Sequence, residues 1–340
     1  MLLQAAAPVY YLHAKSQETP DPTGAGVGEA RSMMIGFIGL GAMGARMVHN
    51  LVDADLEVVI HDLDRGRGYA FEERGATWAE STDELGRQCD VVFTSLPGPQ
   101  QMREVAFDDR GLLSSLRSGA AWFDLTTNAP STVREVSAAA LERGIHVLDA
   151  PVSGRPDGAR TGKLAIYVGG DAAVFESFKP LLDKMGDRVM YVGEVGAGNT
   201  AKLMHNAASI SIRATIAEVM SLGVKAGMSP DTLWSALRQG AIGRARTFDS
   251  IGRRYLQEAY EPPSFALALA DKDLRLALEL ADELDVPMSI ARAAQADYRE
   301  ARERGWGDRD SQSSLALQNE RAGVEIRLTD DQVERILAEG

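Results

Sequence analysis

The sequence predicts an α/β protein with a doubly wound, mostly parallel sheet, followed by a long connecting helix and an all-α C-terminal region. From residue 35 to residue 195, short apolar runs typical of strands alternate with helical patterns, which indicates a parallel sheet with helices on both faces. Beyond Gly198 the pattern becomes almost wholly helical. A chain of 340 residues is long enough for two domains with sizeable cores.

The predicted strands cover residues 35–38, 58–60, 91–95, 121–123, 146–148, 164–168 and 189–192. The predicted helices cover residues 131–143, 172–185, 199–225, 231–238, 249–260, 266–284 and 289–305, with prolines between the later ones. In such a sheet, ligands bind beyond the carboxyl ends of the strands. The segments 96–97, 124–127 and 151–154 are therefore the places to look for chemistry.

A glycine-rich turn follows the first predicted strand directly, with the sequence Gly39-Leu40-Gly41-Ala42-Met43-Gly44. In a G-x-G-x-x-G turn, the first glycine makes the tight turn, the second leaves room for a pyrophosphate, and the third lets helix and strand pack closely. The N-terminus of the following helix carries free N–H groups and a partial positive charge that suit the anion. The segment predicts a Rossmann-type dinucleotide-binding domain.

An acidic residue, Asp62, follows the second predicted strand, where the fingerprint expects a carboxylate for the adenosine ribose. A carboxylate there accepts hydrogen bonds from ribose hydroxyls and repels a 2′-phosphate, so NAD is the predicted cofactor and NADP the alternative. Arg65 and Arg67 are able to hold such a phosphate, but we interpret them as residues of a solvated loop.

Composition excludes several classes of partner. The formal net charge of −13 disfavours nucleic acid and anionic membranes, which need a basic face. Cys89 is the only cysteine, so no disulfide forms within the chain, no Cys/His cluster resembles a metal site, and a cytoplasmic location fits. No apolar run reaches the roughly 18 residues of a membrane span. Residues 1–32 are interpreted as a disordered extension, with a targeting peptide as the alternative.

Three further motifs follow the glycine turn and its continuation through Met47, Asn50 and Leu51. The second is Asp149-Ala150-Pro151-Val152-Ser153-Gly154, followed by Gly158-Ala159, Gly162, Leu164 and Gly169-Gly170. The third is Gly196-Ala197-Gly198-Asn199-Thr200-Ala201-Lys202 with Asn206, and the fourth is Lys272-Asp273-Leu274. In this order the motifs resemble the β-hydroxyacid dehydrogenase family, which includes 3-hydroxyisobutyrate dehydrogenases and tartronate semialdehyde reductases. The likeness runs from about residue 34 to residue 317.

The resemblance implies that Lys202 is the catalytic acid and base, taking the hydroxyl proton during oxidation and returning it during reduction. Asn206 would hold the substrate or the lysine in line, and because the two residues are four apart they project from the same side of a helix. Lys202 also lies near the N-terminus of that helix. The helix dipole and burial both lower a lysine pKa toward neutrality, as proton transfer requires.

The resemblance also implies the binding residues. Ser153 and Gly154 offer a hydroxyl and backbone N–H groups to a substrate carboxylate. Thr127 corresponds to a residue near the nicotinamide and the substrate, and Leu96-Pro97 corresponds to the loop that packs on the cofactor. Lys272 would close over the site from the helical domain and contact both substrate and cofactor.

Two departures from the family pattern concern the substrate. Arg155 replaces a glycine, and its guanidinium either recognises a second anionic group or points to solvent or the interdomain cleft. His205 replaces an asparagine of the family. It would face away from Asn206, so we interpret it as a packed or partner-facing histidine rather than a catalytic one.

The predicted function is a metal-free, NAD-dependent oxidation of a small 3-hydroxy acid, similar to 3-hydroxyisobutyrate, to its semialdehyde. One alternative is an NADPH-dependent aldehyde or imine reductase, although imine reductases usually lack this lysine. Another is a non-catalytic NAD(P)-binding scaffold, which would be expected to lose Lys202. The predicted partners are a small anionic hydroxy acid and further copies of the chain, in a homodimer or homotetramer. The predicted domains are residues 1–32, 33–195, 196–225, 226–318 and a C-terminal tail, 319–340.

Overall fold

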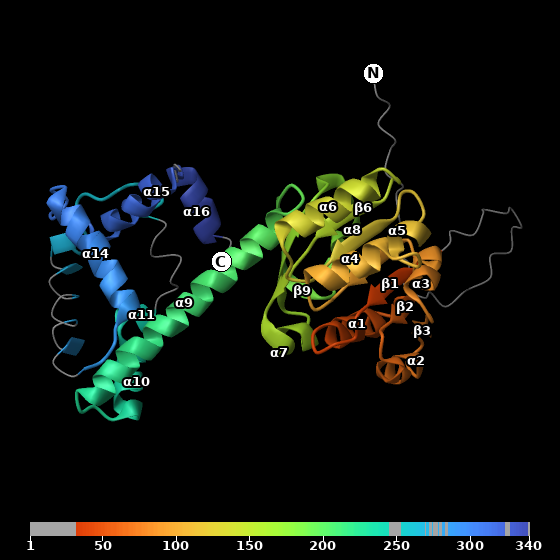
Figure 1. The fold of residues 1–340 in the computed structure, drawn as a ribbon, viewed down its shortest axis with the longest axis horizontal. Coiled ribbons are helices and arrows are strands. Elements are labelled where there is room, and N and C mark those ends of the chain that lie inside the picture. The colour runs from red at the N-terminus through yellow and green to blue at the C-terminus, as the bar shows by residue number, and fades with distance from the viewer. Residues whose placement is uncertain are drawn as a thin grey trace, which may run out of the picture. The chain divides into compact units, whose positions relative to one another are not determined.

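The computed structural model describes residues 32–244, 253–268, 270–271, 274, 278, 281–282, 285–323 and 327–338. The chain divides into two compact units between Ala207 and Ala208, a boundary that falls inside helix α9 (Ala197–Lys225). The first unit contains the sheet with its helices, and the described part of the second unit is mainly helical (Figure 1).

Nine strands of the first unit form one sheet in the order β3-β2-β1-β4-β5-β6-β8-β7, with β9 paired to β8. All pairs from β3 to β6 are parallel, whereas β8 runs antiparallel to β6 and β7. The order 3-2-1-4-5-6 is that of dinucleotide-binding sheets, which confirms the predicted doubly wound, mostly parallel architecture. The strands are β1 (Ile35–Ile38), β2 (Val58–His61), β3 (Thr77–Trp78), β4 (Val91–Thr94), β5 (Ala121–Asp124), β6 (His146–Asp149), β7 (Val152–Ser153), β8 (Leu164–Gly169) and β9 (Gly186–Gly193).

Two of these strands were not predicted, because β3 and β7 have two residues each and show no alternation. The β7 strand falls inside the segment 151–154 that was treated as a loop. It pairs Val152 with Ile166 and Ser153 with Ala165. A strand ladder, rather than a free loop, therefore holds the backbone of Ser153.

Helices cover both faces of the sheet. Alternate residues of a strand point to opposite faces, so Phe37 and Phe93 pack with α1 and α8, while Val92 and Trp122 pack with α3, α4, α5 and α6. The helices of the first unit are α1 (Gly44–Asp53), η1 (Arg65–Arg67), α2 (Tyr69–Glu72), α3 (Thr82–Gln88), α4 (Pro99–Phe107), α5 (Leu112–Ser115), α6 (Pro130–Leu141), α7 (Arg155–Arg160) and α8 (Ala172–Leu182).

A row of buried aromatic rings crosses the centre of the sheet. Strand register places Phe37 beside Phe93 and Phe93 beside Phe123, with ring centroids 6.3 Å and 5.5 Å apart. Phe178 of α8 meets Phe123 edge-on at 5.8 Å. All four rings are buried, so this row joins the strands β1, β4 and β5 to the helix that covers them.

In the second unit, the described residues form two small apolar clusters, one around Leu222 and Met288 and the other around Leu267 and Leu317. Val333 of α16 is also buried, so the segment predicted as a tail contains a packed helix. Beyond α9, the helices with described bounds in this unit are α10 (Pro230–Gln239), α11 (Ala241–Arg244), α14 (Ser289–Glu303), η2 (Ser311–Leu315), α15 (Ala316–Ala322) and α16 (Asp330–Ala338).

One predicted helix needs correction. Helix was expected over residues 249–260, but residues 253–258 form turns. Glu258 has a φ of 53°, a left-handed conformation that an α-helix does not contain, and the N–H of Ala259 bonds back to the carbonyl of Arg254 at 3.0 Å. The predicted substrate and cofactor residue Lys272 lies outside the described residues.

None of the described helices is both long enough and apolar enough to cross a bilayer.

Phe93 offers a test of the aromatic row. Because it lies between two other rings with no exposed surface, we expect Phe93→Ala to lower the free energy of unfolding by about 3–5 kcal/mol. Phe107, at the end of α4, is 46% exposed and is the matched control; Phe107→Ala should cost about 1 kcal/mol or less. Urea unfolding measures both, and equal losses would contradict the central place of Phe93.

Candidate active site

The three glycines of the turn after β1 meet the requirements of a dinucleotide fingerprint. Gly39 has a φ of 97°, and a Cβ on it would collide with the carbonyl oxygen of Ser95. A Cβ on Gly44 would collide with the carbonyl oxygen of Gly39, so only glycine allows helix and strand to approach this closely. At Gly41 the nearest atom to a Cβ lies 3.9 Å away, on the Arg67 guanidinium. The space above Gly41 is therefore open.

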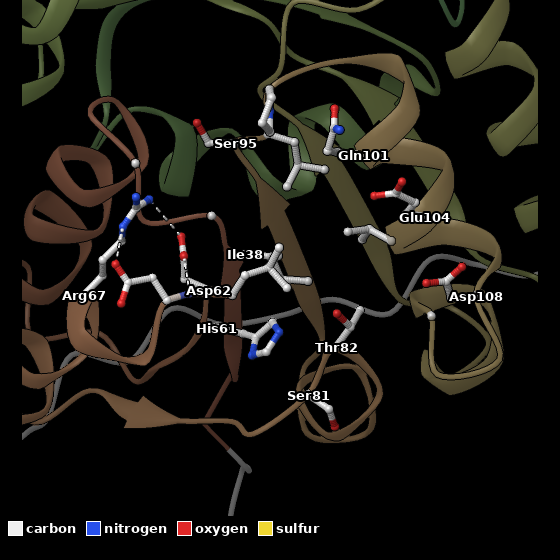
Figure 2. Close-up of a pocket in the computed structure, with 18 of the residues that line it drawn as sticks. Ile38, His61, Asp62, Arg67, Ser81, Thr82, Ser95, Gln101, Glu104 and Asp108 are labelled. Carbon is white, nitrogen blue, oxygen red and sulfur yellow. Dashed lines mark hydrogen bonds and ion pairs between the residues drawn. The ribbon is translucent and has the colours of Figure 1, made fainter.

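The turn opens into a cavity of about 920 Å³ at the carboxyl ends of β1, β2 and β4 (Figure 2). Helix α1 begins at its edge with no side-chain cap and no acidic residue in its first turn, which leaves N–H groups available to an anion. The open space at Gly41 and this helix end fit a dinucleotide. The predicted cofactor residues that line the cavity are Gly39, Gly41, Ala42, Met43, Asp62, Leu96 and Pro97.

Asp62 is held in place by backbone groups. Its side chain is only 9% exposed, and it accepts the N–H of Leu40 at 2.6 Å and the N–H of Asp64 at 2.8 Å. Arg67 lies beside it, with Nη1 3.5 Å from Asp62 Oδ2, as Figure 2 shows. The carboxylate therefore faces the cavity in a fixed orientation next to the glycine turn.

The two arginines after Asp62 behave differently from each other. Arg65 forms a two-pronged ion pair with Glu72 at 2.7 and 3.0 Å, and its guanidinium lies over the rings of Tyr69 and Trp78. Arg65 is therefore paired and stacked, although its side chain is still 37% exposed, and it is not among the residues that line the cavity. Arg67 is about half exposed and lines the cavity.

Loops after neighbouring strands are joined at the floor of the cavity. The N–H of Leu96, after β4, donates to the hydroxyl of Thr126, after β5, at 2.9 Å. Thr127 is the next residue and is exposed at the same edge of the sheet. The parallel strands thus bring the predicted segments 96–97 and 124–127 together.

A buried carboxylate at the end of β6 holds the start of α9. Asp149 Oδ1 accepts the N–H of Gly196 at 2.7 Å, and Oδ2 accepts the N–H of Asn199 at 2.6 Å. A negative charge is favourable at a helix N-terminus. Burial raises the pKa of Asp149, and these hydrogen bonds act in the opposite direction. The end of β6 is therefore tied to α9 less than one turn before Lys202.

A chain of buried polar groups approaches the same helix end from β4 and β5. The indole N–H of Trp122 donates to Thr94, whose hydroxyl donates to Asp124 at 2.8 Å. Asn128 donates from its side chain to Asp124 at 3.0 Å and from its backbone to the side-chain oxygen of Asn199 at 2.5 Å. Burial raises the pKa of Asp124, partly offset by its hydrogen bonds. Three strand ends thus fix the first turn of α9.

Lys202 lies on the first turns of α9 and is 8% exposed. Burial lowers the pKa of its amine from the ordinary 10.5, because a charged amine is disfavoured where water is excluded. Asn206, one turn further along the helix, is partly buried. The pair therefore occupies one side of α9 in a setting that favours a neutral amine.

His205 packs against residues of its own chain, in agreement with the interpretation of a packed histidine. Its ring turns toward the predicted substrate segment, with Nε2 3.1 Å from the hydroxyl oxygen of Ser153, and it lies 6.3 Å from the ring of Tyr167. The contact with Ser153 itself was not expected, because Ser153 is distant in sequence. His205 is thus close to the substrate loop.

Gly154 and Arg155 follow Ser153 in an unusual backbone conformation. Gly154 has a φ of 146° and Arg155 has a φ of 61°, a left-handed value that is uncommon for a residue with a side chain. Arg155 is exposed and makes no hydrogen bond or ion pair with the part of the chain that the structure describes.

Comparison with known families identifies the chain. A model described as the NAD binding domain of 6-phosphogluconate dehydrogenase matches residues 34–193. A second, described as NAD-binding of NADP-dependent 3-hydroxyisobutyrate dehydrogenase, matches residues 196–317. The chain belongs to the β-hydroxyacid dehydrogenase family. It is accordingly an NAD(P)-dependent dehydrogenase that acts on CH–OH donors.

Individual members of the β-hydroxyacid dehydrogenase family are similar along nearly their whole length. The chain is 33% identical to 2-(hydroxymethyl)glutarate dehydrogenase of Eubacterium barkeri over 296 residues, which is 87% of this chain and 98% of that protein. It is 34% identical to NAD-dependent L-serine dehydrogenase of Pseudomonas aeruginosa, over 81% of this chain and 94% of that protein. The structure of Mycobacterium tuberculosis 3-hydroxyisobutyrate dehydrogenase with L-serine is 28% identical, with a TM-score of 0.59, and the match covers 84% and 99% of the two chains.

Sequence reasoning did not find several polar residues of this site. Asp149 was quoted only as part of a motif, and Asn128, Asn199 and Tyr167 were given no role. Asp124 and Asp149 could be predicted from the sequence as polar groups of the site, because each is an acid placed directly after an apolar run. Asn128 carried none, since its partners lie on other loops.

Asp149→Asn tests whether this carboxylate positions the family's lysine. The amide would turn an NH₂ group toward the N–H of Gly196 or Asn199, so we expect a loss of about 3 kcal/mol in the free energy of unfolding and a lower kcat. The control is Asp171→Asn at the exposed N-cap of α8, where asparagine caps as well as aspartate. It should change stability by about 0.5 kcal/mol or less. Similar small effects at both positions would contradict the positioning role.

Proposed function

We propose that this protein is an NAD-dependent dehydrogenase that oxidises a small 3-hydroxy acid, similar to 3-hydroxyisobutyrate, to its semialdehyde. The observation that carries the proposal is Lys202, a buried amine with a lowered pKa near the start of α9, which Asp149 holds at the carboxyl end of β6. A neutral amine in this position has the chemistry of a general base for an alcohol. The resemblance of the chain to the β-hydroxyacid dehydrogenase family supports the same role for Lys202.

The charges around the glycine turn support NAD over NADP. Asp62 and Asp64 both line the cavity beside Gly41, and Arg67 is paired with both of them. A 2′-phosphate would have to displace this pairing and lie against two carboxylates, whereas ribose hydroxyls donate to Asp62. The pocket therefore favours the unphosphorylated ribose.

In the proposed mechanism, bound NAD supplies the hydride acceptor for the carbinol hydrogen. Lys202 Nζ accepts the hydroxyl proton as the carbinol becomes a carbonyl, and it returns that proton in the reverse direction. Asn206, on the same side of α9, orients the substrate hydroxyl or the amine. Asp149 acts indirectly by fixing the helix that carries both residues.

Ser153 and Gly154 are proposed to hold the carboxylate of the substrate with a hydroxyl and backbone N–H groups, and Ser153 lies beside His205 of α9. Thr127 completes this edge of the site. The relatives named for L-serine and 2-(hydroxymethyl)glutarate support a small hydroxy acid, and the second of these acids carries two carboxylates. Arg155 is free to meet such a second carboxylate, which makes dicarboxylic hydroxy acids part of the proposed range.

Two further expectations remain proposals. Lys272 is proposed to complete the site over substrate and cofactor, as in the family. The chain is also proposed to form a homodimer or homotetramer.

The reaction is tested by following NAD and NADP reduction over a panel of 3-hydroxyisobutyrate, glycerate, serine, threonate, 3-hydroxypropionate and dicarboxylic analogues. We expect turnover of at least one acid, with kcat/KM for NAD above that for NADP by about tenfold, which corresponds to a repulsion of only ~1.4 kcal/mol.

In the same assay, Lys202→Ala should lower kcat by about 10²–10⁴-fold. Lys225→Ala, at the exposed end of the same helix, should not change it. Activity confined to NADPH with aldehydes or imines would instead support the reductase alternative. Tight NAD binding without any turnover would support a scaffold.

The pH dependence of oxidation follows from the lysine. Because burial lowers the pKa of Lys202 below 10.5, the neutral amine that accepts a proton forms at a lower pH than for a free lysine. We expect kcat/KM for the acid to rise with pH and level off above a pKa below 10.5, while the reduction, which needs the protonated amine, declines over the same range. An oxidation profile without this rise would contradict Lys202 as the base.

A further inference from the structure

A compact group of three polar side chains surrounds the proposed carboxylate site. Ser153 lies on β7, Tyr167 on the neighbouring strand β8, and His205 on α9. The hydroxyl oxygen of Ser153 is 3.1 Å from His205 Nε2, and the ring of His205 lies 6.3 Å from the ring of Tyr167. The proposed function uses Ser153 alone, so the role of His205 beside it is open.

A count of donors and acceptors limits what Ser153 can do. A serine hydroxyl has one proton to donate and two lone pairs that accept. If His205 Nε2 accepted a hydrogen bond, the single proton of Ser153 would point at the imidazole and only lone pairs would face a substrate. A carboxylate would then meet an acceptor. If His205 donates instead, it uses one lone pair of the hydroxyl, and the serine proton remains available to an anion.

We propose that His205 is a positioning residue that donates a hydrogen bond to the hydroxyl oxygen of Ser153, so that Ser153 presents its proton to the substrate carboxylate. This inference rests on the proposed function, because it assumes that Ser153 binds that carboxylate. It deepens that function by explaining why the site prefers an acid over a neutral alcohol.

The charge of the imidazole is consistent with this arrangement. Burial and the positive charge of Lys202 both lower the pKa of His205 from the ordinary 6.5, so the ring is neutral at pH 7 and carries one N–H. With that proton on Nε2, the ring donates to Ser153.

The hydrogen bond of His205 is made to the proposed carboxylate site, because its Nε2 lies 3.1 Å from the hydroxyl oxygen of Ser153 on β7. Loss of its donated bond would weaken the carboxylate contact equally in the ground state and the transition state, because the carboxylate takes no part in the reaction. Such a loss raises KM and leaves kcat nearly unchanged.

The test compares His205→Met, which has similar length without a donor, with His205→Gln, whose amide can donate in place of Nε2. On the best acid of the panel, we expect His205→Met to raise KM about tenfold with kcat within about twofold. His205→Gln should stay within about threefold of the wild-type KM. With the carboxamide analogue of the same acid as substrate, His205→Met should raise KM by a smaller factor.

Ser153→Ala supplies the background that separates the possible failures. In that background His205→Met should add no further increase in KM, because the hydroxyl that it orients is gone. The inference is overturned if His205→Met leaves KM unchanged while Ser153→Ala raises it, if the two effects simply add, or if His205→Gln behaves like His205→Met. An unchanged KM in Ser153→Ala itself would overturn the proposed carboxylate site and this inference with it.

Discussion

The hydrogen bonds from the first N–H groups of α9 to Asp149 are the constraint on which the rest of the site depends. A helix end leaves N–H groups without partners, and a buried strand end leaves a carboxylate without solvent. Here the N–H groups at the start of α9 donate hydrogen bonds to the carboxylate of Asp149. The consequence is that α9 starts at one fixed place on the sheet, and Lys202 is fixed with it.

The sheet makes this arrangement possible through its strand order. Parallel strands bring the loops after β4, β5 and β6 to one edge, where Asn128 bonds to Asn199 and Leu96 bonds to Thr126. The same edge holds the glycine turn after β1. The residues proposed for cofactor binding and for proton transfer are therefore positioned by one sheet, and the aromatic row across β1, β4 and β5 packs its central strands together.

Burial has opposite consequences for the acids and for the lysine of this site. Asp124 and Asp149 are removed from water but receive several hydrogen bonds each, so their desolvation is partly offset. For Lys202 burial is the dominant influence, and it favours the neutral amine that a base requires. The two aspartates thus have hydrogen-bond partners that stabilise them in the interior. Lys202, the proposed base, is instead shifted toward the neutral form that accepts a proton.

The sequence by itself determined the family, the doubly wound sheet, the glycine turn and the position of Asp62, because these depend on local patterns of apolar residues and glycine. It also placed Lys202 and Asn206 on one side of a helix by spacing alone. Only the tertiary structure decided the roles of Asp149, Asn128 and Asn199, whose partners are distant in sequence. The direction of His205 was decided in the same way, because its partner Ser153 lies 52 residues away on a strand too short to leave a pattern.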